Sequence, residues 1–197
     1  MEHVIAAAHF AGFDLDDDQL AKLADYGRWL ESEAVVAGAI GPGEIARIER
    51  RHLADSLLFA SQFPHEGDEI IDLGSGVGLP GIPLAIALPD IRVSLIDRSG
   101  RRVDLARRAI RVLGLGNCVV VQADVESFTG EAPVIVSRAS LPPGRLRSVA
   151  ERLLAPGGIA VVAGSWQERP EFPGWETREI PRDVLDQPVW LLIMRRQ

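Results

Sequence analysis

The chain has 197 residues, the size of one larger domain, of which 47% are hydrophobic and 25% charged. This composition excludes disordered and collagen-like chains, and no apolar stretch approaches the ~20 residues of a membrane-spanning helix. The formal net charge of −7 argues against a general nucleic-acid-binding protein. The single cysteine, Cys118, cannot form a disulfide within the chain or hold a metal ion alone. Because the first residues also lack the basic start of a signal peptide, we expect a cytoplasmic protein without metal or membrane attachment.

The basic residues are unevenly distributed. Six arginines lie within fourteen residues with one acidic residue, Asp104, among them: Arg98, Arg101, Arg102, Arg107, Arg108 and Arg111. An acidic protein can therefore still carry a basic face. Two interpretations stay open, a solvated helix surface and a face that meets phosphate groups.

The first third of the chain predicts two helices. Leu15, Leu20, Leu23 and Tyr26 fall at helical spacings, which predicts a helix over 15–33. A glycine-rich breaker at 37–44 precedes a second helix over 44–61. We expect residues 1–66 to form a helical extension that packs on a larger unit, residues 67–197.

From residue 69 onward, short strands rich in Val and Ile alternate with amphipathic helices. Such alternation predicts a parallel sheet with helices on both faces, and strands of this composition are typical of sheets covered on both sides. The tail segments 175–183 and 188–196 have no predicted helix between them, so we expect an antiparallel hairpin at the sheet edge. The expected strands are 69–74, 92–97, 118–124, 132–139 and 159–165, and the expected helices are 80–89, 100–116 and 144–158.

A glycine-rich turn follows the first predicted strand and opens a helix, as a nucleotide-binding turn does. Glycines at 74, 76 and 78 let the backbone approach a ligand closely. Asp72 precedes the turn, and Asp97 ends the next strand, where a carboxylate can accept hydrogen bonds from ribose hydroxyls. The third strand leads to Val125 and Glu126, where an adenine would lie.

Two ligand classes fit this turn. The stretch from Gly76 to Gly81 also satisfies the dinucleotide pattern, whose pyrophosphate rests on a helix N-terminus. A carboxylate at Asp72 is better suited to a cationic ligand, and S-adenosylmethionine carries a sulfonium and an ammonium group without phosphate. We therefore favour S-adenosylmethionine over a dinucleotide, and a turn that binds nothing is the third interpretation.

Four stretches resemble the small-subunit ribosomal RNA methyltransferase G family, also called glucose-inhibited division protein B. The likeness runs in order and spacing over about residues 15–195. The GLPGIPL and RHxxDS elements are specific to that family, whereas the DxGxGxG pattern is common to methyltransferases. The matching stretches are Arg51–Leu57, Asp72–Leu84, Leu95–Val103 and Ser137–Ala139.

This resemblance implies a Rossmann-like class I methyltransferase with a mostly parallel seven-stranded sheet, which uses S-adenosylmethionine to methylate N7 of a guanine in 16S ribosomal RNA. Three features depart from the family: Gly38–Ile40 replaces Asn-Leu-Thr, Asp124 replaces Arg, and Ala163–Gly164 replaces Lys-Gly. Asp97 takes the ribose role that the superfamily implies, and Asp72, Gly76 and Gly78 complete the expected cofactor site. The residues that the family pattern places at the cofactor are Gly74, Leu79, Val125, Glu126 and Arg138.

Guanine N7 has no proton to lose, so its methylation needs alignment and no general base. His52 and Asp55 lie three residues apart on one predicted helix face. Together with Arg138 they are candidates for positioning the substrate. The plainer interpretations are a local pair within the helix for His52 and Asp55, and an ion pair for Arg138. For Trp166, Trp175 and Trp190 we favour packing of the edge hairpin over stacking on bases. A small-molecule methyltransferase and a non-catalytic cofactor-binding relative remain alternative functions. Nothing in the sequence requires more than a monomer.

Overall fold

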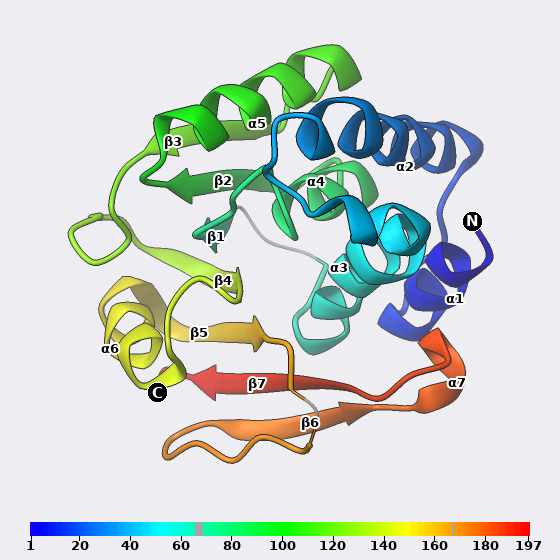
Figure 1. The fold of residues 1–197 in the computed structure, drawn as a ribbon. Helices are drawn as coiled ribbons and strands as arrows, with labels where there is room; N and C mark the ends of the chain where they lie inside the picture. The colour runs from blue at the N-terminus through cyan, green and yellow to red at the C-terminus, as the bar shows by residue number, and fades with distance from the viewer. Residues whose placement is uncertain (66–68, 167) are drawn as a thin grey trace.

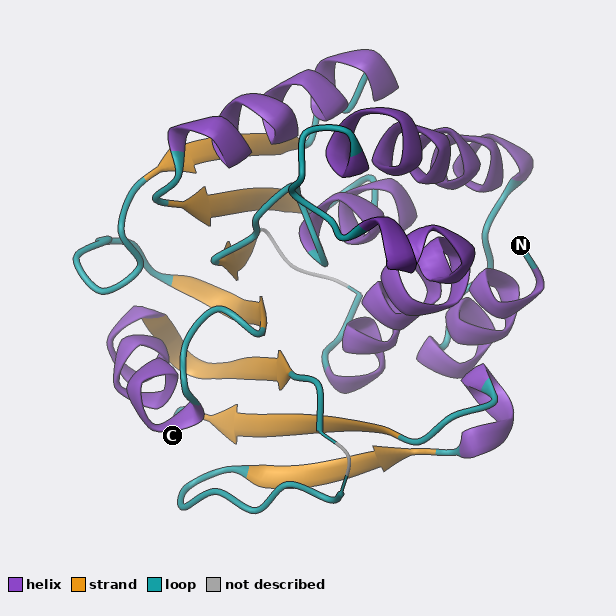
Figure 2. Ribbon diagram, viewed as in Figure 1, coloured by secondary structure: helices purple, strands orange, loops and turns teal. Residues whose placement is uncertain are grey.

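A computed structural model describes residues 1–65, 69–166 and 168–197. Within these residues, a seven-stranded sheet runs through the molecule with helices on both faces (Figures 1 and 2). The strand order is β3-β2-β1-β4-β5-β7-β6, and β7 is antiparallel to both of its neighbours while the other pairs are parallel. The mostly parallel sheet with an antiparallel edge hairpin is therefore confirmed. The strands are β1 (Glu69–Leu73), β2 (Arg92–Asp97), β3 (Cys118–Gln122), β4 (Ala132–Arg138), β5 (Leu154–Ala163), β6 (Glu176–Ile180) and β7 (Val189–Arg195).

Three helices connect the parallel strands. The last of them ends five residues before the predicted boundary at 158, because Leu154 already pairs with Ala132 in the sheet. Among the described residues, no helix combines the length and apolar character needed to cross a bilayer. The connecting helices are α4 (Gly81–Ala87), α5 (Gly100–Leu113) and α6 (Pro143–Leu153).

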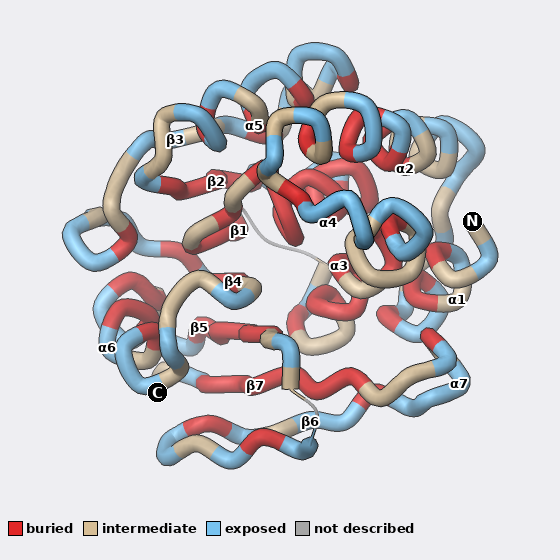
Figure 3. Tube along the Cα trace, viewed as in Figure 1, coloured by how far each residue is buried: buried red, intermediate tan, exposed pale blue. Residues whose placement is uncertain are grey.

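The sheet has a buried core on each face. Along β4, Val134 and Val136 face the core under α4, α5 and the N-terminal extension, whereas Ile135 faces the core under α6. Figure 3 shows the inner strands buried along most of their length. The edge strand β3 differs from the expectation of a strand covered on both sides, because Val119 is 46% exposed and Val121 is 38% exposed.

The N-terminal extension contains one more helix than the sequence analysis predicts, α1 (Glu2–Ala11). Its buried residues Val4, Ala7, Ala8 and Ala11 fall on one helical face, a pattern that is present in the sequence. The helix predicted over 15–33 is confirmed as α2 (Asp17–Trp29), which continues into the π-helical turn η1 (Leu30–Val35). Asp16 caps α2 by accepting the N–H of Gln19 at 2.7 Å.

The second predicted helix is a succession of short turns and not one regular helix. Its apolar residues Ile48 and Leu53 are five positions apart, which suits a π-helical turn better than an α-helix. The segments are η2 (Pro42–Arg47, 3₁₀), η3 (Ile48–Ala54, π), α3 (Asp55–Leu57) and η4 (Leu58–Gln62, 3₁₀).

The extension shares the core on the α4 side of the sheet, where its apolar side chains join those of β1, β2 and β4 in one cluster. The side-chain amide of Gln19 also caps α4 by donating to the carbonyls of Ile86 and Ala87, at 3.2 and 3.1 Å. The predicted boundary between residues 66 and 67 lies outside the described residues, so the division at that point stays a prediction. At the other end of the chain, a one-turn helix, α7 (Arg182–Leu185), lies between β6 and β7, where none was expected.

Candidate functional site

The glycine-rich loop between β1 and α4 is fixed to the end of β2 by three backbone N–H groups. Those of Gly74 and Ser75 donate to the carbonyl oxygen of Ile96, at 2.8 and 3.0 Å. The N–H of Gly76 donates to Oδ2 of Asp97 at 3.0 Å. The loop reaches this geometry with φ values of +72° at Gly74 and +60° at Gly76, which glycine adopts at little cost.

Further N–H groups of this loop are also used internally. Those of Gly78 and Leu79 donate to the carbonyl of Ser75 at 2.8 and 2.9 Å, and that of Gly81 donates to Oδ2 of Asp72 at 2.8 Å. A pyrophosphate site needs such groups free to bind phosphate oxygens. Because the loop turns these donors inward, it fits a ligand without phosphate, and the geometry favours S-adenosylmethionine over a dinucleotide.

Asp72 lies beneath the loop, which corrects the expectation that its carboxylate faces the ligand. The side chain is fully buried, and Oδ1 has no hydrogen-bond partner. Burial raises the pKa of this carboxyl from 3.8 to about 7. Asp72 therefore supports the turn at Gly81, and its buried carboxyl is only partly ionised near neutral pH.

A cavity of about 1200 Å³ lies where the parallel strands end, the edge at which such sheets bind ligands. We call the part lined by the glycine loop, the end of β2 and residues 124–126 the near half. The far half is lined by residues 38–55, the loop after β4 and the segments around 163–166 and 187–190. The predicted site residues that line the cavity are Gly74, Gly76, Leu79, Asp97, Val125, Glu126, Arg138, His52 and Asp55.

Gly78 does not line the cavity. A Cβ at this position would lie 2.3 Å from Cδ1 of Ile82, so the residue is a glycine because the loop packs closely on α4. The structure therefore assigns Gly78 a packing role within the loop, where the sequence pattern had placed it at the ligand.

Five arginines and five carboxylates line the cavity among the described residues, and they form five pairs. Because the opposite charges balance, the cavity is close to neutral despite its many ionic groups. The pairs are Arg51–Glu44 at 3.7 Å, Arg98–Asp124 at 3.8 Å, Arg102–Asp97 and Arg138–Asp55 at 3.4 Å each, and Arg145 with both carboxylate oxygens of Glu126.

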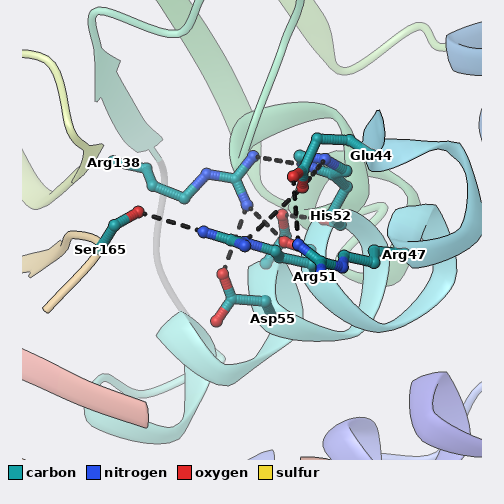
Figure 4. A network of polar contacts seen from close by, with 8 residues as sticks. Glu44, Arg47, Arg51, His52, Asp55, Arg138 and Ser165 are labelled. Carbon is teal, nitrogen blue, oxygen red and sulfur yellow. Dashed lines mark hydrogen bonds and ion pairs between the residues drawn. The ribbon is translucent and has the colours of Figure 1, made fainter. Parts of the chain in front are cut away.

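Arg138 ends β4 and is held by three groups of the extension (Figure 4). Its Nη1 donates to Oδ2 of Asp55 at 3.4 Å and to the carbonyl of Arg51 at 3.1 Å. Its Nη2 donates to Nδ1 of His52 at 3.4 Å. The structure thus brings together the three residues that the sequence analysis proposed for positioning the substrate, and it joins the extension to the end of β4 through them.

The protonation states in this network follow from burial. Desolvation, followed by the positive charge of Arg138, lowers the pKa of His52 from 6.5 to about 4. A neutral ring lets Nδ1 accept from Arg138, while Nε2 lies 3.4 Å from Oε2 of Glu44. Burial raises the pKa of the Asp55 carboxyl, against the opposing effect of Arg138. His52 is therefore neutral at pH 7.

The loop after β4 closes against the glycine loop. Ala139 adopts a φ of +51°, unusual for a residue with a side chain, and its N–H donates to the carbonyl of Ala163 at 3.0 Å. This turn places Ser140 so close to Gly74 that a Cβ at 74 would lie 2.2 Å from the Cβ of Ser140. Oγ of Ser137 donates to the carbonyl of Leu73 at 2.7 Å, which fixes β4 to β1 at the same point. Backbone strain in a residue that lines a cavity, as at Ala139, is common at ligand sites.

Two of the tryptophans also line the cavity. Trp175 packs beside the hairpin as predicted, with Nε1 donating to the carbonyl of Pro143 at 3.2 Å. Trp166 and Trp190, however, line the far half of the cavity. They follow β5 and begin β7, and because β7 is antiparallel to β5, both ends lie at the ligand edge of the sheet.

The arginines of the basic run are exposed, and most of them pair with groups of their own chain. Arg108 pairs with Glu33 at 3.0 Å, and Arg101 donates to the carbonyl of Ala37, so both tie α5 to the extension. Arg107 pairs with Asp104 within the helix. With Arg98 and Arg102 paired at the cavity, the helix surface fits the first of the two interpretations for most of its arginines.

Comparison with known proteins places the chain. The GidB family, described as rRNA small subunit methyltransferase G, matches residues 19–176. The chain belongs to this family. It is 39% identical over 146 residues to ribosomal RNA small subunit methyltransferase G of Acidothermus cellulolyticus, and the match covers 73% of this chain and 65% of that protein. With the protein of the same name from Corynebacterium efficiens, identity is 34% over 204 residues, covering 95% of this chain and 88% of that one.

Solved structures show the same fold at low sequence identity. A SAM-dependent methyltransferase from Aquifex aeolicus superposes with a TM-score of 0.61 at 15% identity, covering 88% of this GidB-family chain and 98% of that chain. A precorrin-6y C5,15-methyltransferase from Geobacter metallireducens gives 0.53 at 11% identity, covering 73% and 88%. The predicted Rossmann-like class I methyltransferase fold is confirmed.

Proposed function

We propose that this chain transfers a methyl group from S-adenosylmethionine to N7 of a guanine in 16S ribosomal RNA. The observation that carries the proposal is membership of the GidB family over residues 19–176, which include the glycine loop and every residue of the Arg138 network. The named relatives are small-subunit ribosomal RNA methyltransferases, which supplies the substrate class. The alternatives raised by the sequence, a small-molecule substrate and a non-catalytic binder, become outcomes of the test.

The near half of the cavity fits S-adenosylmethionine. A Cβ at Gly76 would have only Cδ of Arg102, at 4.0 Å, within contact range, so the backbone here leaves open space for a ligand. The Asp97 carboxylate lines the cavity beside it, with Val125 and Glu126 next along the same wall. Its oxygens already accept from the N–H groups of Gly76 and Ser99, and we assign their remaining lone pairs to the ribose hydroxyls. When bound, the cofactor supplies a methyl group attached to a positively charged sulfur.

Methylation of guanine N7 requires little acid–base catalysis from the protein. Guanine N7 attacks through a lone pair and has no proton to lose, so the chain has to align the base with the methyl group and exclude water. The positive charge moves from the sulfur to the purine as the methyl group is transferred, and the balanced ion pairs of the cavity add no net positive charge that would oppose this move. A neutral His52 that accepts from Arg138 fits this chemistry, because it is used to hold a side chain in place and not to remove a proton.

The far half provides room for the nucleotide. A cavity of about 1200 Å³ exceeds the upper end of the usual range for one small ligand, roughly 1000 Å³. The extension forms one wall and Arg138 lies between the two halves, so we assign His52, Asp55 and Arg138 to positioning the substrate. The expectation of a monomer stays a prediction, and a ribosomal RNA substrate supports a cytoplasmic location.

The test is transfer of labelled methyl from S-adenosylmethionine to 16S ribosomal RNA and to assembling small subunits, followed by nucleoside analysis. We expect 7-methylguanosine as the labelled product. Label at another position refutes the N7 assignment. Cofactor binding by calorimetry without transfer to either RNA substrate points to one of the alternatives, and label in small metabolites of a cell extract then separates the enzyme from the inactive binder.

A further inference from the structure

The indole ring of Trp166 lines the far half of the cavity, just after β5. A Cβ at Gly164 would lie 2.8 Å from the ring, so the ring rests directly on the backbone of a residue that has no side chain. Phe172 supports it with a ring-centroid distance of 6.4 Å and an interplanar angle of 50°. Trp166 is half-buried and lines the cavity. A large aromatic surface is therefore held in place and still open to a ligand.

We propose that Trp166 is the platform on which the target base stacks during methyl transfer. The inference rests on the proposed function and assigns the residue that receives the base. A base that reacts inside a protein cavity has to leave its own stack, and stacking on an aromatic side chain offsets that loss. Trp190 lines the same half but is only 8% exposed, so it forms the floor and leaves Trp166 as the accessible ring.

A cation lies beside this platform. Nη2 of Arg51 donates to Oγ of Ser165, the residue before Trp166, at 3.3 Å. The Arg51 side chain is 41% exposed, and its carboxylate partner Glu44 is 3.7 Å away. A guanidinium next to an aromatic ring is the combination that single-stranded nucleic acid sites use, with the ring for the base and the cation for the phosphate. The far half therefore presents both parts of a nucleotide site.

The experiment compares four variants of the full chain. Trp166→Ala removes the platform, and Trp166→Phe keeps a smaller ring. Gly164→Ala keeps the Trp166 side chain, but the added methyl group displaces its ring from the Gly164 backbone. Trp175→Phe is the matched control, because Trp175 is buried and does not line the cavity. For each we measure the melting temperature, S-adenosylmethionine affinity by calorimetry, kcat and KM for 16S ribosomal RNA, and quenching of tryptophan fluorescence by a guanosine-containing fragment of that RNA.

We expect Trp166→Ala to raise KM for the RNA about 5- to 150-fold, the range that base–aromatic stacking supports. Trp166→Phe should change KM less than about 5-fold, and Gly164→Ala should fall between the two. Cofactor affinity should stay near the wild-type value in all three, whereas the melting temperature should fall in Trp166→Ala, because the ring packs on Gly164 and Phe172. The RNA fragment should quench the fluorescence of the wild type and of Trp175→Phe, and much of that quenching should disappear in Trp166→Phe.

The platform assignment is overturned if Trp166→Ala and Trp175→Phe have the same KM, or if quenching persists in Trp166→Phe. Loss of cofactor affinity in Trp166→Ala would instead make the ring a support of the near half. Failure of the proposed function has a different signature, since the wild type then produces no 7-methylguanosine. In that case the fluorescence measurement alone still decides whether RNA bases reach Trp166.

Discussion

The hydroxyl of Tyr26 donates a 3.0 Å hydrogen bond to the carbonyl oxygen of Val77, and the bond is buried. Tyr26 lies on α2 of the extension, and Val77 lies in the glycine loop 51 residues later. The ring is further fixed by stacking on Trp29, with centroids 6.0 Å apart. The extension therefore holds the cofactor loop directly, as well as forming a wall of the cavity.

Replacement of Tyr26 by Phe should weaken both folding and cofactor binding. The Val77 carbonyl loses its donor while the ring packing is kept, so we expect the free energy of unfolding to fall by about 1–2 kcal/mol. Urea denaturation and calorimetry with S-adenosylmethionine measure the two effects. Ser61→Ala is the matched control, because it removes a hydroxyl–carbonyl bond to Leu58 away from the loop. Equal cofactor affinity in both variants contradicts the role of Tyr26.

Gly76→Ala and Gly114→Ala separate backbone strain from ligand contact. The two glycines have similar φ values of +60° and +64°, so each substitution should cost about 1 kcal/mol of stability. Only Gly76 lines the cavity, so only its variant should lose cofactor affinity, by roughly tenfold or more. Calorimetry with S-adenosylmethionine gives the affinities. If the variants bind equally well, the ligand does not approach Gly76.

Gly74→Ala should destabilise the fold by several kcal/mol, because the new methyl group meets the Cβ of Ser140 at 2.2 Å in a left-handed backbone conformation. Adding Ser140→Gly removes the clash but leaves the unfavourable φ. The double variant should therefore recover part of the melting temperature, with Ser140→Gly alone as the reference. No recovery would mean that the loop after β4 does not press on Gly74.

A double-mutant cycle tests the role of the ion pair between Arg138 and Asp55. Arg138→Met leaves the buried Asp55 carboxylate without its cation, which typically costs about 3–5 kcal/mol. Asp55→Asn in the same chain removes the stranded charge and should restore part of the stability, while methyl transfer stays impaired because the Arg138 side chain is absent. If transfer recovers together with stability, Arg138 serves the fold alone.

The free energy of unfolding should depend on pH through the titration of Asp72. Its pKa is about 7 in the folded chain against 3.8 for an exposed aspartate, so between these values the folded form holds a proton that the unfolded chain has lost. This group therefore lowers the free energy of unfolding as pH rises from about 4 to about 7, by up to a few kcal/mol. Asp72→Asn keeps an acceptor for Gly81 and should remove the effect. We expect denaturation to show that the difference in free energy of unfolding between variant and wild type grows between about pH 4 and 7, and a constant difference contradicts the assignment.

His52 contributes in the opposite direction, because its pKa is lowered from 6.5 to about 4. The unfolded chain binds the proton first, so this group makes the fold more stable as pH rises from about 4 to 6.5. Titration of the ring protons by nuclear magnetic resonance should show His52 neutral down to about pH 4. A midpoint near 6.5 would contradict the buried contact with Arg138.

The sheet could be predicted because its strands and helices alternate with clear apolar patterns, and the glycine loop because glycine is required by its backbone angles. The second segment of the extension does not form the single helix that the sequence predicts. The five-residue spacing from Ile48 to Leu53 resembles an imperfect α-helical spacing, and the sequence alone does not distinguish it from the spacing of a π-helical turn. Helix α1 was missed although Val4, Ala7, Ala8 and Ala11 carry the pattern.

Much of the site depends on contacts that sequence spacing does not encode. Asp72 precedes the glycines as the ligand pattern requires, but the fold buries it, and this burial raises the pKa of its carboxyl to about 7. His52 and Asp55 were predicted as a pair on one helix face and Arg138 at the end of a strand, and the topology brings the three together. Trp166 carries no motif, and its place at the cavity follows from where β5 ends.

The pairing of every arginine in the cavity with a carboxylate has a consequence for nucleic acid. An RNA phosphate gains one of these guanidinium groups only if it separates from its acidic partner, and the freed carboxylate then attracts a cation from solution. Uptake of that cation offsets part of the counterion release that usually drives such binding. Affinity for RNA should therefore fall less steeply with added salt than five arginines alone would suggest, and the fit of the base to the cavity then decides which RNA is bound.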